Sequence, residues 1–281
     1  MNDCRLNSAV RAVVVGFALC GAALSTAAEN GAKAVARAPV VPLDREAMKK
    51  ATVAKEFTAK DGFKLGYRLH LPAETKERPL VVMMRGLGEI GNDNFGQLAL
   101  GAPQLLGYIT EKGHEAVFLA PQCPTGHTWM ECKPWTQPAP WKSTEKAARP
   151  IEAVIELIES VANEYHVNRA RIYVTGMSMG GFATWELILR KPGLFAGAVP
   201  VCGGGDPAMA EKLLRVPIWT THNMRDPAVK AAFSRATVAA FWTLNAKNIR
   251  YTEYWKEGHD AWTETYSDRE ILDWLFSQRR W

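Results

Sequence analysis

The chain has 281 residues, of which 47% are hydrophobic and 22% charged, and its formal net charge is +5. This length suits one α/β domain with a sizeable core after removal of an N-terminal segment. Lys and Arg are spread along the chain and form no cluster, so neither a nucleic acid nor an anionic membrane is expected as a partner.

The N-terminus has the pattern of an export signal. Arg5 and Arg11 are followed by an apolar run at 13–24 and by small residues at 25–28. This order is typical of a cleaved signal peptide over residues 1–28, and the apolar run is short for a membrane span. We expect a secreted or periplasmic protein with no stable membrane insertion after cleavage. An uncleaved anchor is the alternative. Residues 29–54 lack clear periodicity and are interpreted as a linker or arm.

Three cysteines remain beyond residue 28. Cys123 and Cys132 lie close together in one loop, and an exported protein can form disulfides, so these two are the natural pair. Cys202 is then expected as a buried free thiol. The alternative is that all three are reduced and buried as small apolar groups. No Cys or His spacing indicates a metal site, and neither a metal nor a cofactor is expected.

The segments from residue 55 to 281 predict a single α/β domain. Alternating runs at 56–60 and 64–71 flank Asp61-Gly62, which indicates an antiparallel hairpin. Apolar runs typical of buried strands follow, and helical patterns separate most of them. The predicted strands cover 80–84, 116–120, 171–175, 196–202, 216–220 and 249–255, and the predicted helices 97–112, 150–161, 179–190, 228–245 and 268–278. The result is a mostly parallel sheet with an N-terminal antiparallel hairpin and helices on both faces.

One motif carries the strongest chemical signal. Gly176-Met177-Ser178-Met179-Gly180 has the form G-x-S-x-G and lies between a buried strand and a helix. In the α/β-hydrolase fold, such a sharp turn holds a serine in a strained conformation at a helix N-terminus. Ser178 is therefore the predicted nucleophile of the domain at 55–281. The alternative is a glycine-rich turn that happens to contain a serine.

A serine nucleophile needs a base and an acid. This fold uses the chain order serine, acid, histidine, which leaves His222 and His259 as candidate bases. His259 is favoured because it lies in the loop between the last strand and the last helix. Asp226, in the loop after the strand at 216–220, is the predicted acid. Asp206, after the preceding strand, is the alternative.

The oxyanion and the substrate need further groups. The backbone N–H groups of Met179 and Leu87 are the predicted oxyanion donors, since Leu87 lies in a glycine-rich loop after the strand at 80–84. Trp129 and Trp135, in the long loop at 122–145, and Trp262, near His259, are candidate substrate-binding residues. The loop tryptophans fit stacking on a sugar or an aromatic acyl group, and equally fit packing over the sheet.

Four motifs together resemble those of a known group. Arg85–Glu89, Ala120–Pro124, Gly176–Gly181 and Gly258–Trp262 look like the α/β-hydrolases related to polyhydroxybutyrate depolymerases, feruloyl esterases and acetyl-xylan esterases, many of them described as prolyl-oligopeptidase-type peptidases. The resemblance covers residues 55–280 and implies a triad of Ser178, Asp226 and His259. Where the group often has His, this chain has Arg85, which is expected either to alter the oxyanion hole or to pair with Glu89.

The expected activity is hydrolysis of a carboxylic ester through an acyl-enzyme, with a small-molecule or polymeric ester as the substrate. Three alternatives remain open from the sequence: a serine peptidase with the same machinery, an acyltransferase, and a non-catalytic binding module on a hydrolase scaffold. The filled triad positions argue against the last of these, and the absence of room for a large gating domain argues against an oligopeptidase.

Overall fold

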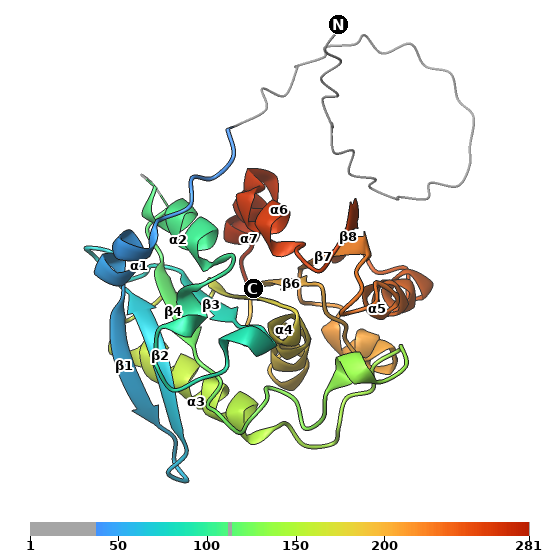
Figure 1. Ribbon diagram of the computed structural model, residues 1–281, viewed down its shortest axis with the longest axis horizontal. Helices are drawn as coiled ribbons and strands as arrows, with labels where there is room; N and C mark the ends of the chain where they lie inside the picture. The colour runs from blue at the N-terminus through green and yellow to red at the C-terminus, as the bar shows by residue number, and fades with distance from the viewer. Residues whose placement is uncertain (1–37, 112–113, 281) are drawn as a thin grey trace, which may run out of the picture.

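The computed structural model describes residues 38–111 and 114–280, and its centre is one eight-stranded sheet (Figure 1). The strand order is β1-β2-β4-β3-β5-β6-β7-β8. The strands are β1 (Val53–Thr58), β2 (Lys64–His70), β3 (Leu80–Met84), β4 (Val117–Pro121), β5 (Ile172–Met177), β6 (Gly197–Val201), β7 (Ile218–Arg225) and β8 (Ile249–Glu257). β2 runs antiparallel to both β1 and β4, and the pairs from β4 to β8 are parallel. The predicted α/β-hydrolase architecture is confirmed.

Helices cover both faces of this sheet (Figure 1). They are α1 (Arg45–Ala51), α2 (Ala102–Thr110), α3 (Arg149–Glu164), α4 (Met179–Arg190), α5 (Ala232–Thr243), α6 (Trp262–Ser267) and α7 (Arg269–Ser277). Buried side chains of α3, α4 and α5 belong to one hydrophobic cluster, and those of α1, α2, α6 and α7 to another. The sheet therefore separates two cores, as expected for a parallel sheet buried on both faces.

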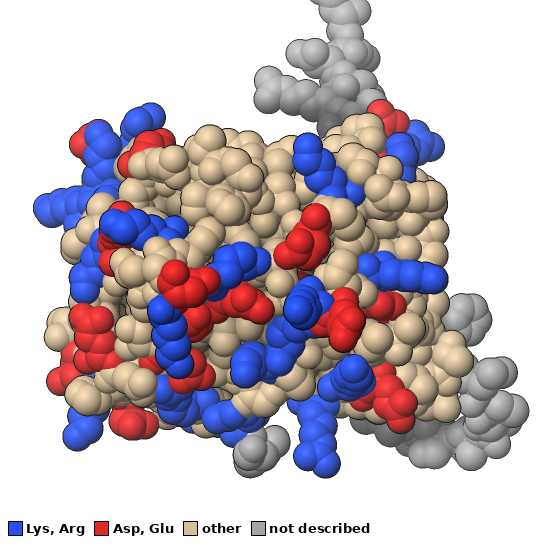
Figure 2. All heavy atoms as spheres, turned by 90° about the horizontal axis from the view of Figure 1, so that it is seen from below, with Lys and Arg blue, Asp and Glu red and all other residues tan. Residues whose placement is uncertain are grey.

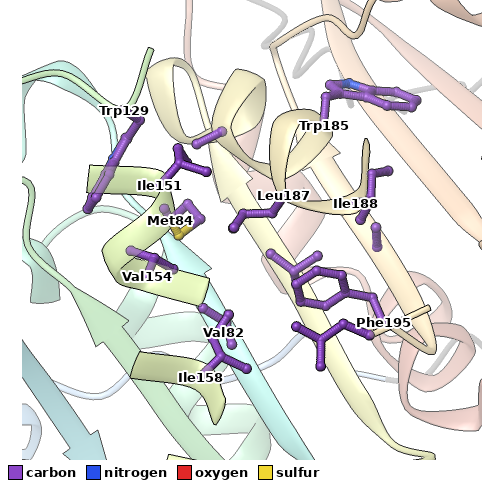
Figure 3. Close-up of a cluster of buried hydrophobic side chains, with 14 of the residues drawn as sticks. Val82, Met84, Trp129, Ile151, Val154, Ile158, Trp185, Leu187, Ile188 and Phe195 are labelled. Carbon is purple, nitrogen blue, oxygen red and sulfur yellow. The ribbon is translucent and has the colours of Figure 1, made fainter. Parts of the chain in front are cut away.

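Strand β3 shows how one apolar run supplies both cores. Val82 and Met84 point to the face covered by α3, where they meet Ile151 and Val154 (Figure 3). Met83, between them, and Val81, before them, belong to the cluster on the other face. Because successive side chains of a strand alternate, a continuous apolar run is needed when both faces are buried. This central strand therefore holds the loop that follows it firmly in place.

The segment interpreted as a linker or arm is partly regular. Helix α1 occupies residues 45–51, begins at an Asp44 cap whose carboxylate accepts a hydrogen bond from the Ala47 N–H, and buries Met48. Its single buried side chain explains why no periodicity was visible in the sequence. The short helix α6 was likewise not predicted. The expected signal peptide lies outside the described residues.

Two surface observations bear on partners. Among residues 38–111 and 114–280, no helix is both long and apolar enough to cross a bilayer. On the face shown in Figure 2, Lys and Arg are interspersed with Asp and Glu. That face therefore carries no extended field of a single sign.

Candidate active site

The turn between β5 and α4 holds Ser178 in a strained backbone conformation. Its φ is 57° and its ψ is −123°, and its N–H donates to the Val201 carbonyl at 3.0 Å. The flanking glycines are required sterically. A Cβ at Gly176 would lie 2.4 Å from the Gly180 carbonyl oxygen, and one at Gly180 would lie 2.3 Å from the Met84 oxygen. Packing of α4 against β3 and β5 thus fixes the direction of the serine hydroxyl.

Three side chains from different strand ends meet at this turn. Ser178 follows β5, Asp226 follows β7, and His259 lies beyond β8. His259 Nε2 is 2.7 Å from Ser178 Oγ, and His259 Nδ1 is 2.6 Å from Asp226 Oδ2. Because the carboxyl ends of parallel strands share one edge of the sheet, residues distant in sequence converge there. The arrangement is a continuous path for a proton from a hydroxyl to an imidazole backed by a carboxylate.

The Asp226 side chain is fully buried yet held as a carboxylate. Burial by itself would raise the pKa of Asp226, but hydrogen bonds from His222, from His259 and from the Val229 N–H hold that pKa below its usual range. Its second oxygen, Oδ1, accepts from the Ala228 and Val229 N–H groups at 2.8 and 2.9 Å. These donors lock the carboxylate in the orientation that His259 requires.

The alternative acid and base have other contacts. Asp206 accepts hydrogen bonds from the Ser143 and Ala208 N–H groups, both at 2.9 Å, and so ties the long loop to the start of a 3₁₀ helix. His222 is buried, with Nδ1 2.7 Å from Ser234 Oγ and Nε2 2.9 Å from the Val229 oxygen. Neither residue contacts Ser178. The structure therefore brings together the favoured set and not the alternative one.

A cavity of about 270 Å³ opens beside Ser178 and His259. Most of its other walls are apolar, supplied by Leu87, Leu100, Trp135, Met177, Val229 and Trp262. Leu87 and Leu100 are 44% and 50% exposed, so they form the rim. Leu100 and Val229 were not identified from the sequence, because nothing in their local patterns distinguishes a cavity wall from ordinary loop or core residues.

The two predicted oxyanion donors are free to bind a ligand. Among the described residues, neither the Leu87 N–H nor the Met179 N–H makes a hydrogen bond. Met179 is the first residue of α4, where helix geometry leaves N–H groups without partners inside the helix. Leu87 begins a single 3₁₀ turn in the loop after β3 and lines the cavity. Both groups therefore suit a developing negative charge.

The three candidate tryptophans separate into two kinds. Trp135 and Trp262 line the cavity, and the Trp262 ring lies edge-on to His259 with centroids 5.3 Å apart. Trp129 is 0% exposed and is not part of the cavity wall, which corrects its assignment as a substrate-binding residue. Its indole N–H instead donates to the Arg85 carbonyl at 3.0 Å. Trp129 lies on the same side of the sheet as Met84 and Ile151 (Figure 3). Its hydrogen bond to residue 85 ties this core to the loop at residues 85–91, which carries the predicted oxyanion donor Leu87 and is called the oxyanion loop.

Arg85, the first residue of that loop, has a completely buried side chain. Its Nη2 donates to the carbonyls of Ala99 and Leu100 at 2.8 and 2.7 Å, and it lies 3.8 Å from Glu89 Oε1. Arg85 is not part of the cavity wall, whereas Glu89 is. The guanidinium therefore links two loops that carry cavity residues, and the expected pairing with Glu89 is an ion pair without a hydrogen bond.

The cysteines differ from the expectation. Cys123, Cys132 and Cys202 are all free, so the predicted disulfide is absent. Cys123 is buried in the core at the end of β4, whereas Cys132 is exposed. Cys202 Sγ lies within 4.8 Å of ligand atoms of Asp226 and His259. Because both nitrogens of His259 already contact Asp226 and Ser178, a metal ion there would disrupt the triad geometry.

Comparison with known proteins agrees with this geometry. The model of the phospholipase/carboxylesterase family matches residues 71–270. The chain belongs to this family. It is thus a member of the α/β-hydrolase superfamily. A solved thermostable esterase is 34% identical, with a TM-score of 0.73 over 82% of this chain and 64% of that chain.

Other relatives are more distant. Poly(3-hydroxyalkanoate) depolymerase C of Paucimonas lemoignei is 29% identical over 128 residues, which are 45% of this chain and 28% of that protein. The feruloyl esterase module of Clostridium thermocellum, solved with sinapinate, is 13% identical, with a TM-score of 0.60 over 85% of this chain and 91% of that one. This chain thus spans less than two thirds of the length of the depolymerase and of the thermostable esterase. The feruloyl esterase likeness shows the fold alone.

Proposed function

We propose that this family member is a serine hydrolase that cleaves carboxylic esters through an acyl-enzyme intermediate. The supporting observation is the path from Ser178 Oγ through His259 to Asp226, with contacts of 2.7 and 2.6 Å, which opens onto a mainly apolar cavity. Membership of the phospholipase/carboxylesterase family agrees with ester substrates.

In the first step, Ser178 Oγ attacks the ester carbonyl while His259 Nε2 accepts its proton. Asp226 holds Nδ1 of the ring and stabilises the imidazolium that forms. The carbonyl oxygen becomes an oxyanion and accepts hydrogen bonds from the free N–H groups of Leu87 and Met179. The tetrahedral intermediate then collapses, the C–O bond to the alcohol breaks, and His259 returns the proton to the leaving alkoxide.

In the second step, water replaces the alcohol. His259 removes a proton from the water as it attacks the acyl carbon, and the same two N–H groups hold the second oxyanion. The bond between the acyl carbon and Ser178 Oγ then breaks and releases the acid, and His259 returns the proton to Ser178 Oγ. The open rim formed by Leu87 and Leu100 admits both water and a leaving alcohol.

The cavity limits the substrate class. About 270 Å³ with apolar walls suits a short aliphatic or single-ring acyl group, with the alcohol part extending to solvent. Esters on plant polysaccharides or of polyester type meet this description. A polymeric alcohol or acid would require only that one ester group reach Ser178.

The protein is proposed to act in the periplasm or outside the cell, with residues 1–28 as a cleaved signal peptide.

Hydrolysis assays test this proposal. The panel contains 4-nitrophenyl acetate, butyrate and octanoate, methyl ferulate, acetylated xylan, polyhydroxybutyrate and peptide anilides. Ser178→Ala is expected to lose about 10⁵-fold or more in kcat, because nucleophilic catalysis is removed while the core is untouched. Exposed Ser277 provides the control, and Ser277→Ala should keep full activity.

A fluorophosphonate probe gives a second readout on the same proteins. It should label the wild-type protein and Ser277→Ala at Ser178 and leave Ser178→Ala unlabelled. Full ester hydrolysis by Ser178→Ala would refute the assignment of the nucleophile. Faster cleavage of anilides than of every ester would instead identify a peptidase. Sequencing of the exported protein from its N-terminus tests the processing at residue 28.

A further inference from the structure

The cavity contains a buried carboxylate whose hydrogen bonds are incomplete. The Glu89 side chain is only 5% exposed, yet Glu89 lines the cavity together with Ser178 and His259. Its Oε2 atom is buried and has no hydrogen-bond partner among the described residues. Leaving a buried carboxylate oxygen unpaired is costly, so such an atom beside a nucleophile requires an explanation.

Arg85 accounts for the charge of Glu89 but not for its missing hydrogen bond. The Arg85 Nη2 atom is 3.8 Å from Oε1, which is too long for a hydrogen bond. The same nitrogen donates instead to the carbonyls of Ala99 and Leu100. With a guanidinium this close, a second cation is not needed at Glu89. What the carboxylate lacks is a neutral donor.

The unpaired oxygen lies on the nucleophile side of the oxyanion loop. A methyl group added at Gly86 would lie 2.9 Å from Glu89 Oε2 and 3.7 Å from Ser178 Cβ. Oε2 and the serine side chain therefore both lie within 4 Å of one point beside Gly86. Leu87, the proposed oxyanion donor, is the next residue. A substrate carbonyl held against Ser178 and the Leu87 N–H thus brings its neighbouring atoms close to Oε2.

We propose that Glu89 Oε2 accepts a hydrogen bond from a hydroxyl group of the ester substrate, located within a few bonds of the scissile carbonyl. This inference rests on the proposed esterase function and narrows its substrates to hydroxylated esters. A hydroxyl fits because it is neutral and donates one hydrogen bond, while the apolar walls receive the rest of the group. Sites built to pair with a substrate hydroxyl reject the analogue that lacks it, since the protein group is then left unpaired.

Matched esters test the inference. On the acyl side, 4-nitrophenyl butyrate is compared with its 2-hydroxy and 3-hydroxy analogues, and on the alcohol side propyl butyrate is compared with 2-hydroxypropyl butyrate. Each ratio of kcat/KM is divided by the ratio for hydrolysis by hydroxide ion, which removes intrinsic reactivity. The wild-type enzyme should prefer at least one hydroxylated member by tenfold or more. Corrected ratios near one for every pair would overturn the inference.

Variants separate recognition from loop support. Glu89→Met removes the acceptor, and Glu89→Gln keeps the shape while replacing one oxygen by a donor. Both should lower the corrected preference for the hydroxylated ester at least fivefold, and exposed Glu131 supplies the control, since Glu131→Gln should keep it. An equal loss on both members of a pair would assign Glu89 to support of the loop and refute recognition.

If the Glu89 variants do not fold, the corrected kcat/KM ratios of the wild-type enzyme still decide whether hydroxylated esters are preferred. Hydrolysis of plain esters without any preference would refute this inference alone and leave the proposed function standing. Failure to hydrolyse any ester in the panel would refute both.

Discussion

His222 Nε2 lies 3.5 Å from Asp226 Oδ2, the same oxygen that contacts His259 Nδ1 at 2.6 Å. Nε2 also faces the Val229 carbonyl oxygen at 2.9 Å, so both of these neighbours are hydrogen-bond acceptors. The buried carboxylate is therefore held between two imidazoles, one in the triad and one behind it. We therefore expect His222, four residues before Asp226, to position this carboxylate and not to act as a second base.

The identity of the acid is testable by a pair of substitutions. Asp226→Asn should cut kcat by about 10⁴-fold, because the amide no longer holds the imidazole in the required tautomer. Asp206→Asn should keep kcat within about threefold, because the Asp206 carboxylate accepts hydrogen bonds from the N–H groups of Ser143 and Ala208 and does not contact His259. Steady-state kinetics on 4-nitrophenyl butyrate at pH 7 measures both. The opposite pattern would move the acid to the loop after β6.

The depressed pKa of Asp226 predicts an acid-sensitive stability. The folded protein keeps Asp226 ionised below the pKa of about 3.9 that the side chain has when unfolded. Below pH 5 the unfolded chain therefore binds more protons, so the stabilising contribution of this group is full above pH 5 and is lost as the pH falls through the folded pKa. Urea unfolding at pH 6, 5, 4 and 3 measures the effect.

Two variants serve as comparisons for that experiment. The difference in free energy of unfolding between the wild-type protein and Asp226→Asn should shrink as the pH falls from 5 to 3. In His222→Asn the loss should be smaller and should end at a higher pH, because one of the hydrogen bonds that lower the pKa of Asp226 in the folded protein is weakened. A difference between wild type and Asp226→Asn that stays constant with pH would contradict the account.

The close approach of α4 to β3 predicts a strong effect of a single methyl group. In Gly180→Ala the new Cβ would lie 2.3 Å from the Met84 oxygen and 2.8 Å from the Arg85 nitrogen, both of them backbone atoms that cannot rotate away. We expect a loss of about 1–3 kcal/mol in stability and a fall in kcat, because the nucleophile turn and the oxyanion loop separate. Gly193→Ala, with no atom within 4 Å of the new Cβ, is the control.

The three cysteines should differ in reactivity. Cys132 is exposed, while burial raises the pKa of Cys123 to about 12 and that of Cys202 well above its usual value. A thiol reagent at pH 8 should therefore modify Cys132 within minutes in the native protein, and the other two only after denaturation. Peptide mass mapping reads the sites. A linked Cys123–Cys132 peptide would show instead that the exported protein forms the disulfide.

The local chemistry of the site follows from short stretches of sequence. A serine between glycines, after a buried strand and before a helix, predicts a tight turn, and this turn needs the glycines because a Cβ at 176 or 180 would collide with backbone. The order of the strands then places Asp226 and His259 at the same edge of the sheet as Ser178. Parallel strands have all their carboxyl ends on one side, so chain order is enough to predict this convergence.

Tertiary packing decided what chain order leaves open. Trp129 and Trp135 come from the same loop and have the same side chain, yet one is fully buried under the oxyanion loop and the other lines the cavity. Cys123 and Cys132 are close in sequence, but the first is buried in the core and the second is exposed to solvent. In the sequence Glu89 is indistinguishable from an ordinary loop glutamate. In the structure Arg85 Nη2 donates to the carbonyls of residues 99 and 100 and leaves Glu89 without a hydrogen bond from this nitrogen. In each case the outcome depends on which distant segment fills the neighbouring space, since burial and hydrogen-bond partners are properties of the packed interior and not of the local sequence.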